Sequence, residues 1–155
     1  MSERGLELLT EWEGSEPQLY HDVAGLPTIG VGHLLTRDEL SSGKIHIIGE
    51  DVKYRDGLTE DQIDRLLAQD LRPTEGTVTN NVLVDLLQHQ FDALVSFVFN
   101  VGRSAFMAST LLRKLNAGIF EEVPVQMRRW VYAGGRRVQG LVNRREKEVR
   151  LWENL

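Results

Sequence analysis

Cysteine is absent from the 155 residues of this chain, which excludes a disulfide framework and a zinc site built on thiolates. No apolar run approaches the roughly 20 residues that a helix needs to cross a bilayer. The first stretch, MSERGLELLTEWEG, has charges at Glu3, Arg4 and Glu7 and therefore lacks the apolar core of a signal peptide. We expect a protein made soluble in the cytoplasm, without stable membrane insertion, that reaches an external target only with help.

An excess of positive charge is also missing. The formal net charge is −5, with 18 Lys and Arg against 23 Asp and Glu. This balance argues against nucleic acid as a partner, because phosphate binding needs a positive field. Basic residues do cluster late in the chain, at Arg128, Arg129, Arg136, Arg137, Arg144, Arg145 and Arg150. The cluster is either a solvated helix face or the basic side of a polarised cleft.

The length is sufficient for one domain that buries roughly 70% of its unfolded surface. Apolar residues from Leu6 to Trp12 recur at helical spacing and predict a helix over residues 3–13. The period then changes, and residues 18–34 predict a β-hairpin. Glycines at three positions of this hairpin indicate backbone bends or close approaches. They are Gly25, Gly30 and Gly32.

Later helices are predicted by apolar period and by capping residues. Thr36 with Glu39 and Thr59 with Gln62 have the spacing of capping boxes, and Pro73 is expected to end the second of these helices. Apolar residues recur most regularly at helical spacing over residues 83–99, which predicts a central helix with a wide apolar face. The expected helix ranges are 59–72, 83–99, 109–116, 120–132 and 141–152. Segment 41–57 is interpreted as a loop or a small strand with turns, so the fold class is α+β and mainly helical.

Asp70 lies on the apolar face of the helix expected over 59–72, where an acid needs a partner if it is buried. His33, at the end of the hairpin, is the candidate. An ion pair between them would stabilise the fold while both groups are charged.

Two carboxylates and a hydroxyl lie within the first helix and the hairpin: Glu13, Asp22 and Thr28. Inverting glycosidases place a general acid and a general base roughly 6.5 to 9.5 Å apart, with a water on the base side. A folded-back hairpin can give Glu13 and Asp22 such a separation, and Thr28, across the hairpin, can hold the water. Taken alone, residues of these types more often lie on the surface, at the end of a helix or in a turn, than in an active site.

The longer pattern EG-x5-Y-x-D-x2-G-x2-TIG-x-GH contains the spacing E-x8-D-x5-T of these groups. It resembles the phage-type lysozymes, the muramidases of glycoside hydrolase family 24 that include the T-even phage lysozyme and many lambdoid-phage endolysins. The resemblance continues through LTEDQIDRLLAQDL, QFDALVSFVFNVG, STLLRKLNAG and RRWVYAGGRRVQGLVNRRE, and so covers nearly all of the chain in order. Segment 41–57 matches least.

The resemblance implies roles for particular residues. Glu13 takes the position of the catalytic acid, which protonates the oxygen leaving from the bond between N-acetylmuramic acid and N-acetylglucosamine. Asp22 resembles the residue that activates or supports the attack, and Thr28 the one that orients the water. Arg144, or the adjacent Arg145, falls where family members pair an arginine with the catalytic glutamate.

Other positions are implied to support the site. His33 and Asp70 fall where some members have a stabilising ion pair. Leu34, Phe99 and Asn100 resemble cleft-lining positions that contact substrate, although Phe99 is as readily explained as a core residue.

The family also implies an arrangement of lobes. One domain, 1–155, would contain a small lobe of about residues 14–58, a connecting helix of about 59–72, and a helical lobe of about 73–155 together with the N-terminal helix. The glycan strand would lie between the lobes. No metal or other cofactor is expected.

The expected function is that of an endolysin, a hydrolase that cuts peptidoglycan with inversion and lyses the host cell. We expect a monomer in the host cytoplasm that acts on the wall in the periplasm after release through a holin-type pore. A second interpretation is a wall-degrading domain of a virion tail or a bacterial secreted system. A third is a non-catalytic glycan-binding module, which the presence of all three catalytic-type residues disfavours.

Overall fold

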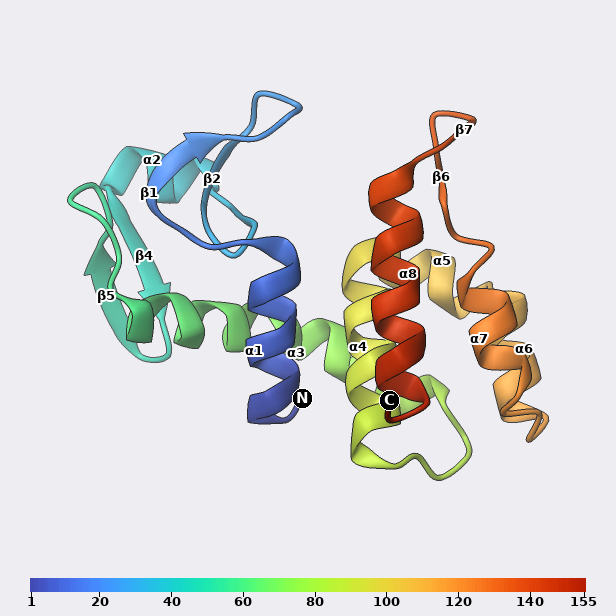
Figure 1. Cartoon of the computed structure of the whole chain (residues 1–155). Helices are drawn as coiled ribbons and strands as arrows, with labels where there is room; N and C mark the ends of the chain where they lie inside the picture. The colour runs from blue at the N-terminus through green and yellow to red at the C-terminus, as the bar shows by residue number, and fades with distance from the viewer. The chain divides into compact units, whose positions relative to one another are not determined.

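The computed structural model describes residues 1–155, which form two compact units. One unit is Leu6–Arg72, and the other combines Met1–Gly5 with Pro73–Leu155. Helices dominate and the sheets are small and antiparallel (Figure 1), so the expected α+β, mainly helical class is confirmed.

The unit Leu6–Arg72 contains most of the β structure. Its elements are most of α1 (Glu3–Glu13), β1 (Glu16–His21), β2 (Pro27–Gly30), β3 (His33–Leu34), α2 (Arg37–Ser42), β4 (Lys44–Ile47), β5 (Glu50–Lys53) and the first half of α3 (Glu60–Asn81). The first helix ends where it was predicted to end, and both capping boxes are present. Thr36 and Glu39 cap α2 reciprocally, and the same paired hydrogen bonds join Thr59 and Gln62 before α3.

The predicted hairpin is part of a three-stranded sheet of order β1-β2-β3. Tyr20 pairs with Thr28 across β1 and β2, and Thr28 pairs with Leu34 across β2 and β3, so these three side chains share one face. Gly30 has φ 64°, and a Cβ there would lie 3.7 Å from the Ile63 side chain. That separation is an ordinary van der Waals contact, so glycine is favoured here by the left-handed backbone and not by the packing of the sheet on α3.

Segment 41–57 is more ordered than the sequence indicated. Strands β4 and β5 form a hairpin in which Ile45 pairs with Val52, and both side chains are buried. Tyr54 follows, almost fully buried, and its hydroxyl donates to the Glu39 carbonyl oxygen at 3.0 Å. Each strand has only four residues, too few for alternation to be distinguished from a loop.

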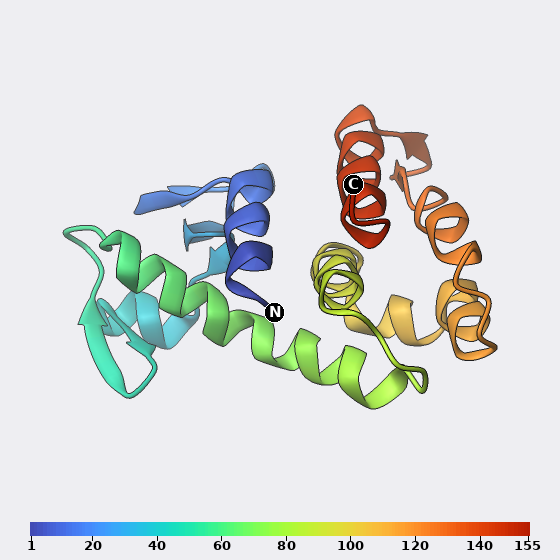
Figure 2. The ribbon, with the colours of Figure 1, turned by 60° about the horizontal axis from the view of Figure 1, so that its bottom comes forward.

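The prediction that Pro73 ends its helix is wrong. Helix α3 runs for 22 residues with Pro73 inside it. Its ribbon is continuous in Figure 2. Proline removes one helical hydrogen bond and crowds the preceding turn, at a cost of roughly 3 kcal/mol. Burial of Thr74 and Val78 in the following turns favours continuation of the helix against that cost.

The second unit is built around α4 (Gln88–Val101), which packs along α8 (Gln139–Trp152) (Figures 1 and 2). Seven consecutive residues of α4, 92–98, are buried, so the prediction of a central helix is confirmed. The remaining elements are α5 (Arg103–Met107), α6 (Thr110–Asn116), α7 (Glu122–Met127), β6 (Tyr132–Ala133) and β7 (Arg136–Arg137).

Several boundaries in this unit differ from the expected ranges. Helix α4 begins at Gln88 rather than 83, because the Gln90 side chain accepts the Leu87 amide hydrogen and closes the first turn there. The helix expected over 120–132 is shorter than predicted: α7 ends at Met127, and the chain then continues into the β6–β7 hairpin. That hairpin turns at Gly134 and Gly135, both with positive φ.

Candidate functional site

Glu13 is the last residue of α1 and its side chain is exposed. Gly14 follows with φ 79°, and its amide donates to the Thr10 carbonyl oxygen at 2.9 Å. A glycine in the left-handed region after a helix is a common stop signal, and it turns the chain directly into β1. The helix end therefore presents the Glu13 carboxyl group at the start of the sheet.

Asp22 and Thr28 are oriented by the same loop residue. Asp22 Oδ1 accepts the amide hydrogens of Ala24 and Leu26, both at 2.9 Å. The Leu26 carbonyl oxygen accepts the Thr28 hydroxyl at 2.9 Å. Because the Thr28 hydroxyl hydrogen is already donated to Leu26, Thr28 Oγ1 can only accept a further hydrogen bond. Asp22 Oδ2 is a second acceptor. The loop thus fixes two oxygen acceptors within one short segment.

The pKa of the Tyr20 phenol is affected by the charges around it. Partial burial raises its pKa, and the carboxylates of Glu16, Asp22 and Glu13 raise it further. Both proposed catalytic carboxylates therefore act electrostatically on the same hydroxyl. Tyr20 is also the cross-strand neighbour of Thr28, so the structure brings Glu13, Asp22 and Thr28 to one region of the sheet.

Leu34, predicted to contact substrate, lies in the same row of the sheet. It pairs with Thr28 and is 51% exposed. Leu34 therefore offers exposed apolar surface beside the buried Thr28, and its contact with substrate stays a prediction.

The predicted contact between His33 and Asp70 is present. His33 Nδ1 lies 2.8 Å from Asp70 Oδ2, and His33 Nε2 lies 3.1 Å from Glu39 Oε2. Burial lowers the pKa of the imidazole, but the hydrogen bonds and charges of Asp70 and Glu39 outweigh it, so the pKa of His33 is raised. Glu39 is a second partner of His33, which the position of Asp70 on its helix did not indicate.

This ion pair gives a pH-dependent stability. A histidine whose folded pKa is raised stabilises the fold below its unfolded pKa, and the contribution disappears as pH rises through the folded pKa. We expect Asp70→Asn to lower the free energy of unfolding by about 1.5 to 3 kcal/mol at pH 6 and by much less at pH 9. Urea unfolding at both pH values measures this difference.

The matched control is Asp51→Asn. Asp51 pairs with His46 at 3.0 Å, but both side chains are 66% exposed. We expect a change of about 0.5 kcal/mol or less, because exposed ion pairs contribute little. An equal loss at pH 6 and pH 9 for Asp70→Asn would contradict the linkage.

Arg144 and Arg145 both pair with one buried acid of their own unit. Arg144 Nε lies 2.8 Å from Glu148 Oε1, and Arg145 Nε lies 2.7 Å from Glu148 Oε2. Ser96 of α4 donates to Glu148 Oε1 at 2.8 Å and accepts from Arg144 Nη2 at 3.0 Å. Burial raises the pKa of Glu148, and the Arg145 and Arg144 guanidiniums oppose that shift. Pairing of either arginine with Glu13 stays a prediction.

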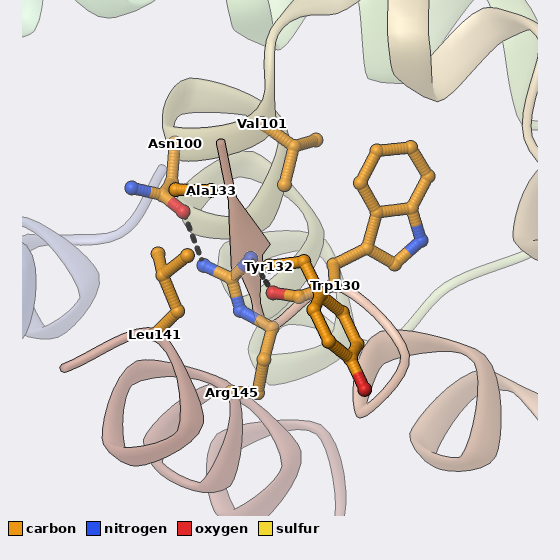
Figure 3. A pocket seen from close by; sticks show the side chains of 7 residues that line it. All are labelled: Asn100, Val101, Trp130, Tyr132, Ala133, Leu141 and Arg145. Atoms are coloured by element: carbon orange, nitrogen blue, oxygen red, sulfur yellow. Dashed lines mark hydrogen bonds between the residues drawn. The ribbon is translucent and has the colours of Figure 1, made fainter. Parts of the chain in front are cut away.

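Asn100, predicted to contact substrate, lines a pocket of about 360 Å³ within the second unit (Figure 3). The other lining residues are Val101, Trp130, Tyr132, Ala133, Leu141 and Arg145. Phe99 does not line this pocket and is partly buried, so its role in binding stays a prediction beside the core explanation.

The structure has no helix long and apolar enough to cross a membrane. No group of three or more His, Asp and Glu side chains converges in a way that could hold a metal ion.

The sequence profile described as phage lysozyme matches residues 10–148. The chain belongs to the phage lysozyme family. A SAR-endolysin of Escherichia phage Mu is 39% identical over 133 residues, which are 86% of this chain and 69% of that relative. The chain spans about half the length of two other relatives, the endolysins of Bacillus phages B103 and PZA, which it covers to 53% and 55%.

Solved structures of phage and bacterial proteins have the same fold. A mutant of P22 lysozyme has a TM-score of 0.82 at 34% identity, with 99% of this chain and 97% of that chain covered. The muramidase domain of SpmX from Asticaccaulis excentricus has a TM-score of 0.79 at 33% identity, with 97% and 95% covered. Together with its family, these likenesses show that the protein is a glycoside hydrolase, a peptidoglycan-degrading enzyme of the endolysin class.

Several groups of the second unit were not predicted from the sequence. Glu148 follows Arg144 by four residues and Arg145 by three, a spacing at which helical side chains meet. That spacing was a usable signal for the buried ion pairs. The contributions of Trp130 and Tyr132 to the pocket had no such signal, because they depend on the path of the chain after α7.

Proposed function

We propose that this enzyme is a muramidase of glycoside hydrolase family 24, related to the T-even phage lysozyme. It hydrolyses the β-1,4 bond between N-acetylmuramic acid and N-acetylglucosamine with inversion, and it causes host cell lysis. It acts as one lysozyme domain over residues 1–155. The observation that carries the proposal is the shared orientation of Asp22 and Thr28 by Leu26, in a sheet entered directly from Glu13.

The proposed step uses each group once. Glu13 gives its proton to the glycosidic oxygen as the bond from that oxygen to the anomeric carbon breaks. A water attacks the opposite face of the sugar, and Asp22 Oδ2 takes the proton that the water loses. Thr28 Oγ1 accepts the second hydrogen of the same water, because its own hydrogen is engaged by the Leu26 carbonyl oxygen. A water held through both hydrogens directs a lone pair at the sugar carbon.

The remaining residues are proposed to bind the glycan or to support the fold and the catalytic glutamate. Leu34 supplies an apolar contact beside Thr28, while Phe99 and Asn100 contact the glycan from the second unit. The pair of His33 with Asp70 supports the fold. Arg144 or Arg145 is proposed to pair with the catalytic glutamate.

The proposal is tested by digestion of purified peptidoglycan, followed by mass spectrometry of the soluble products. New reducing ends at N-acetylmuramic acid are expected. Anhydro ends would identify a lytic transglycosylase instead. Reducing ends at N-acetylglucosamine would identify the other glycosidic bond as the target.

Asp22→Asn is expected to lower the rate of wall lysis by roughly 10²- to 10⁴-fold, the range typical of acid–base groups. The amide loses the negative charge that takes the proton, but its oxygen can still accept the two loop amides, so the melting temperature should change little. Glu16→Gln is the matched control, because Glu16 is another exposed acid near Tyr20. Turbidity loss of a wall suspension measures both, and wild-type lysis by Asp22→Asn would remove the residue from the mechanism.

The route to the wall remains part of the proposal. We propose a monomer made in the host cytoplasm that acts on the wall after release through a holin-type pore. Several relatives are named SAR-endolysins, a name that hints at export without such a pore. Expression with and without a holin distinguishes the routes, since lysis without one would remove the pore requirement.

A second candidate is a wall-degrading domain outside host lysis, in a virion tail or a bacterial secreted system. The observation in its favour is the likeness to the muramidase domain of a bacterial protein. The catalytic step would be the same. A non-catalytic glycan-binding module is a weaker alternative, which binding to walls without turbidity loss would support.

A further inference from the structure

The exposed face of the β4–β5 hairpin brings two positive charges together (Figure 1). Lys44 and Lys53 are direct cross-strand partners, and both side chains are exposed. Partners in an antiparallel pair have their side chains on the same face, and like charges placed opposite each other destabilise the pair. An anion between the two ammonium groups would remove that repulsion. The pairing therefore favours an external anion at this position.

Arg55 adds a third positive charge to the same face. The Tyr54 amide donates to the Gly43 carbonyl oxygen at 3.3 Å, which continues the pairing of the two strands beyond Lys44 and Lys53. Arg55 comes two residues after Lys53, so the two side chains leave the strand on the same side. We call Lys44, Lys53 and Arg55 the cationic row.

The guanidinium of Arg55 is held in position by two features. Its Nη2 donates to the Leu40 carbonyl oxygen at 2.9 Å, in the last turn of α2. A Cβ on Gly43 would lie 2.8 Å from Arg55 Cζ, so the glycine leaves room for the guanidinium. Leu40 occupies only one of the N–H donors of Arg55, and the others remain for a ligand.

The acids of the hairpin do not neutralise the cationic row. Asp51 pairs with His46 at 3.0 Å, and Glu50 pairs with Arg65 at 3.5 Å. No ion pair in the structure joins an acid to a residue of the row. In a chain with a net charge of −5, the row is thus a local positive site that lacks a counter-charge from the protein.

We propose that the cationic row binds phosphate groups of a phosphate-bearing polymer of the cell envelope and so holds the enzyme at the wall. A tetrahedral phosphate directs its oxygens out of a single plane, so it can meet ammonium groups of both strands and the fork of a guanidinium. The row lies on exposed surface, where a small anion is held weakly. A polymer gains affinity because neighbouring phosphates bind together.

The binding test measures the dissociation constant for poly(glycerol phosphate) by calorimetry. The salt concentration is about 0.1 M, at which the Debye length of about 10 Å screens distant charges. Lys44→Gln combined with Lys53→Gln should raise the dissociation constant at least about tenfold, because both ammonium donors are lost. Both side chains are exposed, so the melting temperature should not fall.

The matched control is Arg136→Gln combined with Arg137→Gln. It removes the same charge from exposed positions of the second unit, and it should change the dissociation constant by less than about threefold. Equal weakening by the two double variants would overturn the site, because binding would then follow net charge alone.

Arg55→Lys tests the guanidinium fork. The substitution keeps the charge but loses the planar set of donors, so the affinity should fall about threefold. Wild-type affinity in this variant would overturn the part assigned to Arg55.

Two further probes identify the ligand. Polyglutamate of the same length should bind more weakly, because its carboxylates are planar, and equal affinity would overturn the assignment to phosphate. Inorganic phosphate should shift the amide signals of Lys44 and Lys53 in a ¹H–¹⁵N spectrum only at higher concentration than the polymer. Shifts by inorganic phosphate without binding of the polymer would overturn the polymer as the partner.

Cleavage assays separate this proposal from the proposed function. The double variant Lys44→Gln with Lys53→Gln should cut purified peptidoglycan at the wild-type rate, and its KM should rise at least about threefold on walls that retain phosphate polymers. An equal loss on both substrates would overturn the proposal, because the row would then serve cleavage itself. Binding of the polymer by a wild-type enzyme that cuts neither substrate would support the row while the proposed function fails.

Discussion

Glu13→Gln is expected to abolish wall lysis, with a loss of at least roughly 10²- to 10⁴-fold in rate. The amide has the shape of the carboxyl group but cannot give up a proton to the leaving oxygen. The side chain is exposed at the end of α1, so the fold should be retained and the melting temperature should stay close to that of wild type. Turbidity loss of a peptidoglycan suspension and mass spectrometry of the products measure the effect.

Comparing substrates with different leaving groups shows whether Glu13 acts as a general acid or only binds the substrate. A substrate with a nitrophenyl leaving group needs no protonation, so Glu13→Gln should cleave it with a much smaller deficit than peptidoglycan. Glu11→Gln is the matched control on the same helix, since Glu11 is also exposed. Wild-type lysis by Glu13→Gln, or the same deficit on both substrates, would exclude Glu13 as the general acid.

The local signals in the sequence predicted local structure well. The capping boxes at Thr36 and Thr59 depend on residues three apart, and both are present. The positive φ values of Gly25, Gly30 and Gly32 agree with the bends expected from their positions. Such features follow from the chemistry of a few adjacent residues, so no tertiary information is needed.

Tertiary contacts explain the failures. The burial of Thr74 and Val78 carries α3 through Pro73, and no local rule contains that burial. Likewise, the residue types of Glu13, Asp22 and Thr28 were visible, but the two amides on Asp22 Oδ1 come from a loop conformation. The sequence thus indicates which groups are candidates, while the fold determines which of their atoms remain available.

Glu148→Gln is expected to lower the free energy of unfolding by about 3 to 5 kcal/mol, the cost of breaking a buried ion pair. The substitution removes the one carboxylate that Arg144 and Arg145 share at 2.8 and 2.7 Å. It also turns an NH₂ group toward guanidiniums that have only donors. Urea unfolding at neutral pH measures the loss. Glu146→Gln on the same helix is the control, because its pair with Arg128 is about half exposed and should contribute no more than about 1 kcal/mol. Similar losses for both variants would mean that burial does not increase the contribution of the Glu148 ion pairs to the free energy of unfolding, which would contradict the prediction.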